Sequence, residues 1–208
     1  MSTVLANIGL MSVEDYLAFE AKSKVRHEYM DGEIIAMAGA SRNHSLIASN
    51  INRHVGNQVV SRGCEVHQSD LRVRVRETHY VYPDVVVVCG EVHLAPGVMD
   101  TLLNPTVVFE VLSKSTEYRD RHEKAADYFA LDSVREFVLV SQRRMSVEHF
   151  VRQGKKEWRL MLFDEPDEGI FFPSLECRLK LAQIYELVKL PALKAVPDKR
   201  QKNAKRRG

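Results

Sequence analysis

Two short apolar segments, each carrying one carboxylate, most constrain what this chain can fold into. They are residues 82–88, where Asp84 precedes a run of valines, and residues 104–112, where Glu110 stands among Val, Phe and Leu. Their β-branched composition favours strands, and the lack of apolar–polar alternation predicts that both faces are covered, as in the middle of a sheet. A buried carboxylate is costly unless it is paired, hydrogen-bonded or bound to a metal. Asp84 and Glu110 on neighbouring strands therefore predict a functional site.

Each carboxylate also has a structural interpretation. Asp84 follows a proline and would end a turn, and Glu110 would form an internal ion pair with an arginine. A lysine-bearing helix directly after the second segment favours the functional interpretation, because perturbed charges cluster at functional sites.

Length and composition predict one globular domain over residues 1–190. The chain has 208 residues, of which 45% are hydrophobic and 28% charged, as in ordinary soluble domains. The first ten residues lack the pattern of a secretory signal, and no apolar run reaches the length of a membrane span, so we expect a cytoplasmic protein without a membrane contact. The three cysteines, Cys64, Cys89 and Cys177, share no CxxC spacing, which indicates reduced thiols.

Residues 191–208 are expected to form a basic, disordered tail. Residues 192–208 hold seven Lys or Arg side chains against one acid, Asp198, which gives this segment a net charge of +6. Because the whole chain carries +2, the remaining residues carry −4. The body is therefore not a generic basic nucleic-acid binder, whereas the tail could contact phosphates.

The order of predicted elements indicates an α/β (α+β) fold with a mixed central sheet flanked by helices. Ser12 caps a first helix, and Asp31-Gly32 predicts a hairpin turn. Further helices are predicted over residues 41–61, 117–131 and 182–189, and strands over residues 64–67, 71–76, 80–88, 106–112, 136–140, 146–151, 158–163, 170–172 and 179–181. The helix after Glu110 predicts a crossover between parallel strands. The N-terminus is thus a helix and hairpin, and the C-terminal end is rich in strands.

Paired carboxylates at Asp84 and Glu110 suit a hard divalent cation. Oxygen ligands favour Mg²⁺ or Mn²⁺ over zinc, and no His/Cys grouping has zinc spacing. Such a metal can polarise a phosphoryl oxygen and acidify a bound water. A lysine nearby would stabilise charge that develops on the phosphate.

A set of motifs in a fixed order resembles a known group of nucleases. The set is Tyr16-Leu17, Glu28-Tyr29-Met30-Asp31-Gly32-Glu33-Ile34, His44, Tyr82-Pro83-Asp84-Val85, Glu110-Val111-Leu112-Ser113, Asp120, Lys124 and Tyr128. It resembles the PD-(D/E)XK nuclease superfamily and, more closely, its Uma-type restriction endonuclease family, over residues 11–190. The resemblance implies a restriction-endonuclease-like core and a Mg²⁺-dependent enzyme that hydrolyses DNA phosphodiester bonds, with Asp84 and Glu110 as metal ligands. Cleavage of both strands further implies a homodimer.

The resemblance leaves the lysine of the site open. In the superfamily a lysine stands two residues after the acid, where this chain has Leu112. Uma-type sequences carry a lysine at the place of Lys124, which shares a helical stripe with Asp120 and is our choice. The structural alternative is an exposed Asp120–Lys124 ion pair. Lys114 is the rival, but at ~3.3 Å per residue it lies about 13 Å beyond Glu110 along the strand.

Weaker candidates complete the predicted site. They are Glu33, His44, Asp70 and Asp120, with Glu28 beside the same hairpin as Glu33. A solvated hairpin position is the alternative for both glutamates, a capping or packing role for His44, and a turn for Asp70. Asp70 begins a strand of alternating residues that is expected beside the strand of Asp84. The alternating face of Arg72, Arg74 and Arg76 on it suits phosphate contacts or a charge-guarded edge strand.

Three functions compete on these observations. The first is a metal-dependent DNA endonuclease in which Lys124 supports the attack on phosphorus. The second is an inactive nuclease fold that binds DNA or a protein, favoured by Leu112 at the lysine position and by the negative body. The third is a metal-free hydrolase that uses two carboxylates, as glycosidases do, and it ranks last because Trp158 alone suggests a sugar platform.

Overall fold

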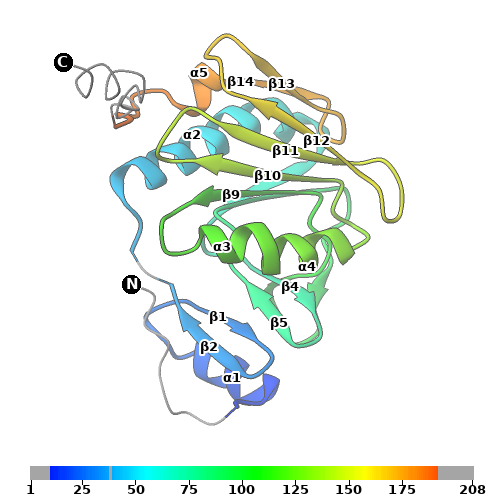
Figure 1. The fold of residues 1–208 in the computed structure, drawn as a ribbon. Helices are drawn as coiled ribbons and strands as arrows, with labels where there is room; N and C mark the ends of the chain where they lie inside the picture. The colour runs from blue at the N-terminus through cyan, green and yellow to red at the C-terminus, as the bar shows by residue number, and fades with distance from the viewer. Residues whose placement is uncertain (1–9, 38, 192–208) are drawn as a thin grey trace, which may run out of the picture.

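The computed structural model describes residues 10–37 and 39–191, so the predicted tail lies outside the described part apart from residue 191 (Figure 1). The helical elements are α1 (Val13–Glu20), α2 (Arg42–Val59), the 3-10 turn η1 (Val60–Arg62), α3 (Glu117–Arg119), the π-helical turn η2 (Asp120–Lys124), α4 (Ala125–Ala130) and α5 (Leu181–Ile184). The strands are β1 (His27–Met30), β2 (Glu33–Ala36), β3 (Cys64–Gln68), β4 (Arg72–Arg76), β5 (His79–Val81), β6 (Val85–Cys89), β7 (Leu94–Ala95), β8 (Val98–Leu102), β9 (Val107–Leu112), β10 (Glu136–Ser141), β11 (Val147–Arg152), β12 (Trp158–Phe163), β13 (Gly169–Phe172) and β14 (Cys177–Lys180). The predicted mixed α and β architecture is confirmed.

The main sheet has the strand order β12-β11-β10-β9-β6-β3. β9 and β10 are parallel, and the α3–η2–α4 segment connects them, as the crossover prediction required. The other pairs in this sheet are antiparallel. Strand β6, which begins directly after Asp84, and strand β9, which contains Glu110, are therefore direct neighbours inside the sheet.

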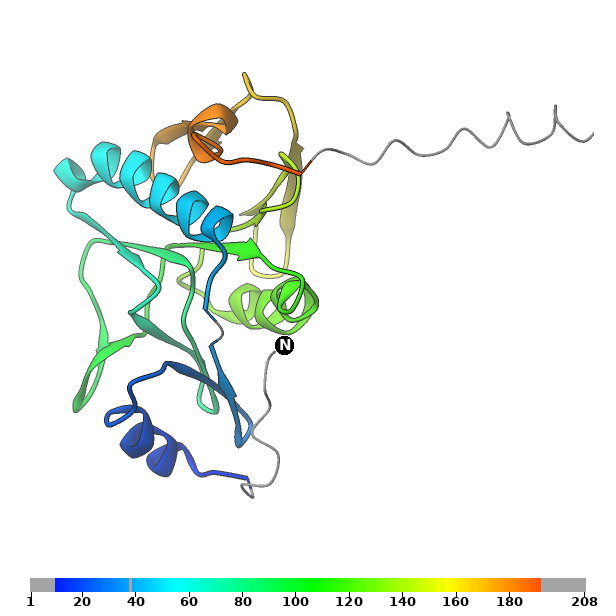
Figure 2. The same cartoon turned by 90° about the vertical axis from the view of Figure 1, so that its left-hand side faces the viewer.

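Helices cover both faces of the main sheet, which explains its unbroken apolar sequence. The buried face of α2, with Ile47, Ile51 and Val55, packs on one side against residues such as Phe109. On the other side α4 packs Tyr128 in a second core cluster. Figures 1 and 2 show α2 and the α3–α4 segment on opposite faces of the sheet. A strand between two such layers has no face for water.

The serine caps and the turn glycines behave as the sequence indicates. The Ser12 and Ser41 hydroxyls accept hydrogen bonds from the backbone N–H groups three residues on, at 3.1 and 3.2 Å. Gly63 ends the long helical segment with φ +73°, where a side chain would be strained. The last helix is shorter than predicted, since α5 ends at Ile184.

A second six-stranded sheet, of order β2-β1-β5-β4-β8-β7, corrects the prediction of one central sheet. The predicted strand over residues 80–88 is broken at Tyr82-Pro83-Asp84, so that β5 joins one sheet and β6 the other. Pro83 has no N–H to donate to a ladder, which favours the break there. Strands β7 and β8 flank Pro96-Gly97 and were not expected.

The basic strand β4 also lies elsewhere than predicted. It pairs with β5 and β8, not with the strand of Asp84, so it is not an edge. Arg72 is buried and binds Asp100 at 2.7 Å, while Arg74 pairs with Glu77 and Arg76 with Asp127. The three arginines are thus held by carboxylates and do not form a free phosphate-binding face.

The prediction of three reduced thiols is wrong in this structure. Cys64 and Cys89 form a disulfide, because the antiparallel register of β3 and β6 places them directly opposite each other. Cys177 is free and buried. Burial raises the pKa of the Cys177 thiol to about 11.

Among the described residues, no helix has the length and apolar character needed to cross a membrane.

Candidate active site

The register of β6 and β9 brings the two predicted carboxylates together. Val85 pairs with Phe109 in this antiparallel ladder, so the next position along places Asp84 opposite Glu110. Residues opposite each other in a sheet point to the same face. Here that is the face covered by α4, because Val86 and Val108, two residues from each acid, belong to the cluster with Tyr128. Both acids line one cavity of about 420 Å³.

Lys124 reaches this cavity from the opposite wall. Its Nζ lies 3.2 Å from Glu110 Oε1, 2.7 Å from Glu28 Oε1 and 3.3 Å from Asp120 Oδ1. The side chain belongs to the π-helical turn η2, a feature often found at functional sites. Asp120 and Lys124 are thus paired, but the pair is buried and not the exposed surface pair that was the alternative.

The buried charges perturb one another strongly. Burial, together with the neighbouring carboxylates Asp120, Asp84 and Glu28, raises the pKa of Glu110 well above its ordinary range, although Lys124 opposes the rise. Burial also raises the pKa of Asp120. Burial opposes the charge of Lys124, but the surrounding carboxylates outweigh it and raise the Lys124 pKa. The ammonium form is therefore the stable one, and Lys124 is a cation and hydrogen-bond donor.

Two further groups orient the acids. Tyr128 Oη donates a hydrogen bond to Glu110 Oε1 at 2.9 Å, and the backbone N–H of Val111 donates to Asp84 Oδ2 at 2.7 Å. His44, at the start of α2, places Nε2 3.2 Å from the same Asp84 oxygen. Burial disfavours the charged imidazole, but the hydrogen bond to Asp84 outweighs it and raises the pKa of His44. His44 thus belongs to the site through Asp84.

Glu28 is a site residue that sequence reasoning ranked too low. It was weighed as a solvated hairpin residue, whereas in the structure it is buried and binds both Lys124 and Arg119, the latter at 3.1 Å. Pairing of β1 with β5 places it beside Tyr82, whose backbone N–H lies 3.5 Å from Glu28 Oε1. Its place in the N-terminal motif was the signal that pointed to it.

The structure separates three candidates from the cavity. Glu33 is exposed on β2 and lines a different hollow, beside His79 and Asp127. Asp70 is exposed in the turn between β3 and β4. Lys114 is exposed after the end of β9, whereas Lys124 is buried against Glu110. Within the described residues neither Asp84 nor Glu110 is paired with an arginine, and both reach the cavity wall.

The donor set fits a hard divalent cation by charge and chemistry. Four carboxylates, those of Glu28, Asp84, Glu110 and Asp120, surround one lysine, one arginine and His44. Burial, and after it the crowding of negative charge, raise the pKa of Glu110, and a bound cation would relieve the crowding. The described residues contain no ready-made group of three or more His, Cys, Asp or Glu ligands. Two carboxylates suffice for Mg²⁺, which keeps several of its waters.

Comparisons with known proteins identify the family of this chain. The model of the family described as "Uma2: Putative restriction endonuclease" matches residues 13–182. The chain belongs to the Uma2 family. Two relatives from Synechocystis, the uncharacterized proteins sll1609 and slr1290, are each 32% identical over 158 residues, which is 76% of this chain and 89% and 82% of theirs.

The Uma2 fold also matches a solved structure. A crystal structure described as a putative nuclease belonging to DUF820, from Anabaena variabilis, has a TM-score of 0.71 and 18% sequence identity, and the match covers 86% of this chain and 99% of that one. At that identity the likeness establishes the fold alone. Family membership and fold together support a nuclease in general terms.

Proposed function

We propose that this Uma2 protein is a Mg²⁺-dependent endonuclease that hydrolyses phosphodiester bonds in DNA, with Mn²⁺ as an alternative metal. One observation carries the proposal: two carboxylates from adjacent strands share a cavity, and Lys124 Nζ lies 3.2 Å from Glu110. Crowded carboxylates with a buried ammonium suit a cation and a phosphate better than they suit a neutral substrate.

The residues have separable roles in this proposal. Asp84 and Glu110 would hold the metal, and the bound metal would supply polarisation of a phosphoryl oxygen and a more acidic water. Tyr128 and the Val111 N–H fix the orientation of the two acids by the hydrogen bonds described above. Lys124 stays protonated because its pKa is raised, so it stabilises negative charge on the phosphate and does not act as a base.

Plasmid nicking tests the proposal. Supercoiled DNA should be nicked with Mg²⁺ or Mn²⁺ and not with EDTA, and Asp84→Asn, Glu110→Gln and Lys124→Met should each reduce the rate at least about a hundredfold. Asp70→Asn and Lys155→Met remove the same chemical groups from exposed positions and serve as matched controls. Activity that survives Asp84→Asn or EDTA would show that this site is not responsible.

The second candidate is a nuclease fold that binds nucleic acid without cleaving it. The observation that favours it is that Lys124 is already engaged by three carboxylates, while Leu112 occupies the position two residues after Glu110. Binding without nicking across a range of divalent metals would support this reading.

Cleavage of both strands would require two active sites, so we also propose a homodimer. Light scattering coupled to size exclusion tests the assembly, and a monomer at assay concentration would contradict it.

A further inference from the structure

One side of the cavity mouth is built from four separate segments that hydrogen bonds tie together. The Ser41 hydroxyl, at the start of α2, donates to Gln142 Oε1 in the β10–β11 loop at 2.5 Å. Gln142 Nε2 donates to the carbonyl of Leu112, at the end of β9, at 3.0 Å. Asn43 Nδ2 donates to the carbonyl of Lys189, after α5, at 2.9 Å. Ser41 and Gln142 also line the cavity, so these segments frame its opening.

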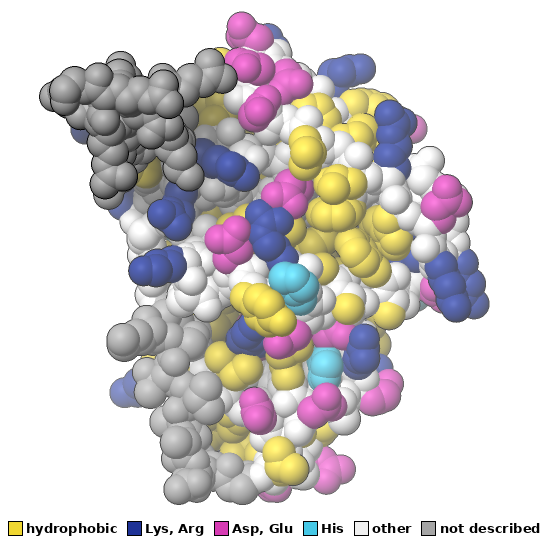
Figure 3. All heavy atoms as spheres, in the orientation of Figure 1, with side chains coloured by type: hydrophobic (Ala, Val, Ile, Leu, Met, Phe, Trp, Pro, Cys, Tyr) yellow, Lys and Arg dark blue, Asp and Glu magenta, His cyan; other side chains and the backbone are white. Residues whose placement is uncertain are grey.

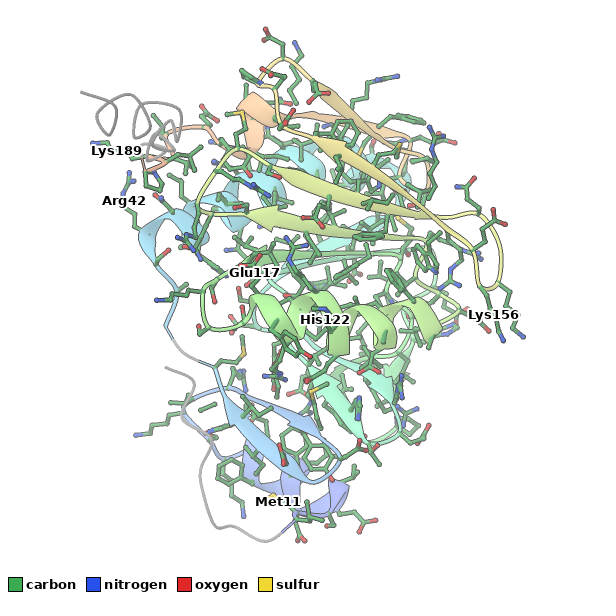
Figure 4. All side chains as sticks on the ribbon, viewed as in Figure 1. Met11, Arg42, Glu117, His122, Lys156 and Lys189 are labelled. Atoms are coloured by element: carbon green, nitrogen blue, oxygen red, sulfur yellow. A yellow bond between two sulfur atoms is a disulfide. The ribbon has the colours of Figure 1, made fainter. Side chains whose placement is uncertain are left out.

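These four segments carry five exposed cations, which we term the basic rim. They are Arg42, Lys114, Arg143, Arg144 and Lys189. Figure 4 labels Arg42 and Lys189 near each other at the start of α2, and Figure 3 shows Lys and Arg side chains on the same side of the molecule. The rim therefore lies beside the carboxylate cavity and does not overlap it.

The basic rim, like the exposed Lys155 and Lys156, has no carboxylate partners among the described residues. No ion pair involves any of its five side chains within residues 10–37 and 39–191. Elsewhere Arg53 binds Glu186, Arg62 binds Glu176 and Arg121 binds Glu148. Cations without internal partners keep their full charge available to an external anion.

We propose that the basic rim binds the phosphates of a nucleic-acid strand on one side of the cleaved bond, which deepens the proposed function. A phosphate in the cavity faces four carboxylates, which repel it. A bound metal and cations that hold the neighbouring phosphates of the strand would offset this repulsion. Cations on four segments at a cavity mouth suit an anion whose charges are spaced along a chain. Phosphate contacts of this kind position the strand and carry no sequence information.

The β11 strand supplies a matched control. Its preceding loop carries Arg143 and Arg144 beside the cavity, whereas its following turn carries the equally exposed Lys155 and Lys156. Figure 4 shows Lys156 on the side of the molecule opposite Arg42 and Lys189. The double variants R143A/R144A and K155A/K156A thus remove the same charge from the two ends of one strand.

The test measures binding of a fluorescent DNA duplex by anisotropy in EDTA over a range of salt. R143A/R144A should weaken binding roughly tenfold and lower the slope of log affinity against log salt by about 2, since each lost phosphate contact removes about 0.9. K155A/K156A should change affinity less than about twofold. Circular dichroism checks that both variants are folded.

Four results would overturn the inference. They are equal losses in both double variants, wild-type affinity in R143A/R144A, a wild-type protein that does not bind DNA, and rim-dependent binding to phosphatidylserine vesicles in place of DNA. Because the assay contains no metal, its outcome is separate from that of cleavage. A protein that nicks plasmid while R143A/R144A binds like wild type keeps its proposed function and loses the rim. Rim-dependent binding without cleavage supports the rim and the second candidate function.

Discussion

Replacement of Lys124 by methionine should destabilise the protein strongly. Methionine keeps the apolar stem, so packing changes little, but the ammonium that faces Glu28, Glu110 and Asp120 is lost. Removing one partner from a buried ion pair typically costs about 3–5 kcal/mol, because the opposite charge stays buried.

Proton uptake by one of the remaining carboxylates limits this loss of stability. A carboxyl group with an ordinary pKa of 4.5 lies three pH units below about pH 7.5. Each unit costs about 1.36 kcal/mol, so protonating that group costs about 4 kcal/mol. The raised pKa of Glu110 makes this the acid that takes the proton most readily. We therefore expect Lys124→Met to lower the free energy of unfolding by about 3–4 kcal/mol in EDTA.

Urea denaturation followed by the fluorescence of Trp158, the one tryptophan in the sequence, measures this change. Lys155→Met, at an exposed position, is the control and should alter stability by less than about 0.5 kcal/mol. In the Lys124→Met background, Glu28→Gln should recover part of the loss, since it removes one uncompensated carboxylate. A loss below about 1 kcal/mol for Lys124→Met, or a further loss in the double variant, would refute the account of Lys124 as the charge that holds these acids together.

Three other predictions follow from the described residues. Burial opposes protonation of His79, but hydrogen bonds to Asp127 and Asp31 raise its pKa above 6.5, so its stabilising contribution is complete below that pH and declines as the pH rises through the raised value. The difference in unfolding free energy between wild type and His79→Gln should therefore shrink as the pH rises above 6.5, and a constant difference would contradict this. Thiol titration of the unreduced, denatured protein should find one group, Cys177, and three groups would exclude the disulfide; reduction should cost about 3 kcal/mol of stability for a loop of 25 residues. Phe109→Ala should cost about 3–5 kcal/mol in urea denaturation because Phe109 is fully buried, whereas Phe171→Ala, at a side chain that is 42% exposed, should cost far less.

Much of the local structure was predictable because short-range patterns encode it. The unbroken, β-branched apolar runs around Glu110 and after Asp84 predicted inner strands, and the Asp31-Gly32 dipeptide predicted a hairpin. The helical spacing of Asp120, Lys124 and Tyr128 predicted one buried stripe, and all three side chains are buried. Such patterns indicate which face of a helix or strand points to the core. In this fold the side chains on that face are buried.

Those patterns could not predict which helices and strands pack or pair with each other. Strand β4 was expected beside Asp84 but belongs to the second sheet, and the pairing of β3 with β6 joins two cysteines that share no sequence spacing. Long-range pairing also places Glu28: β1 pairs with β5, and Glu28 Oε1 lies 2.7 Å from Lys124 Nζ. Its side chain contacts Lys124 and Arg119, which lie far from it in the chain.

The sequence by itself determined the strands of Asp84 and Glu110, the inward face of the helix that holds Lys124, and the family to which these residues point. Tertiary structure alone decided that Asp84 stands opposite Glu110, that Glu28 completes the charge cluster and that five cations lie on one side of the cavity. The reason is physical: side-chain periodicity is a property of one segment, whereas strand order and register depend on free energies of contact between segments that are far apart in the chain.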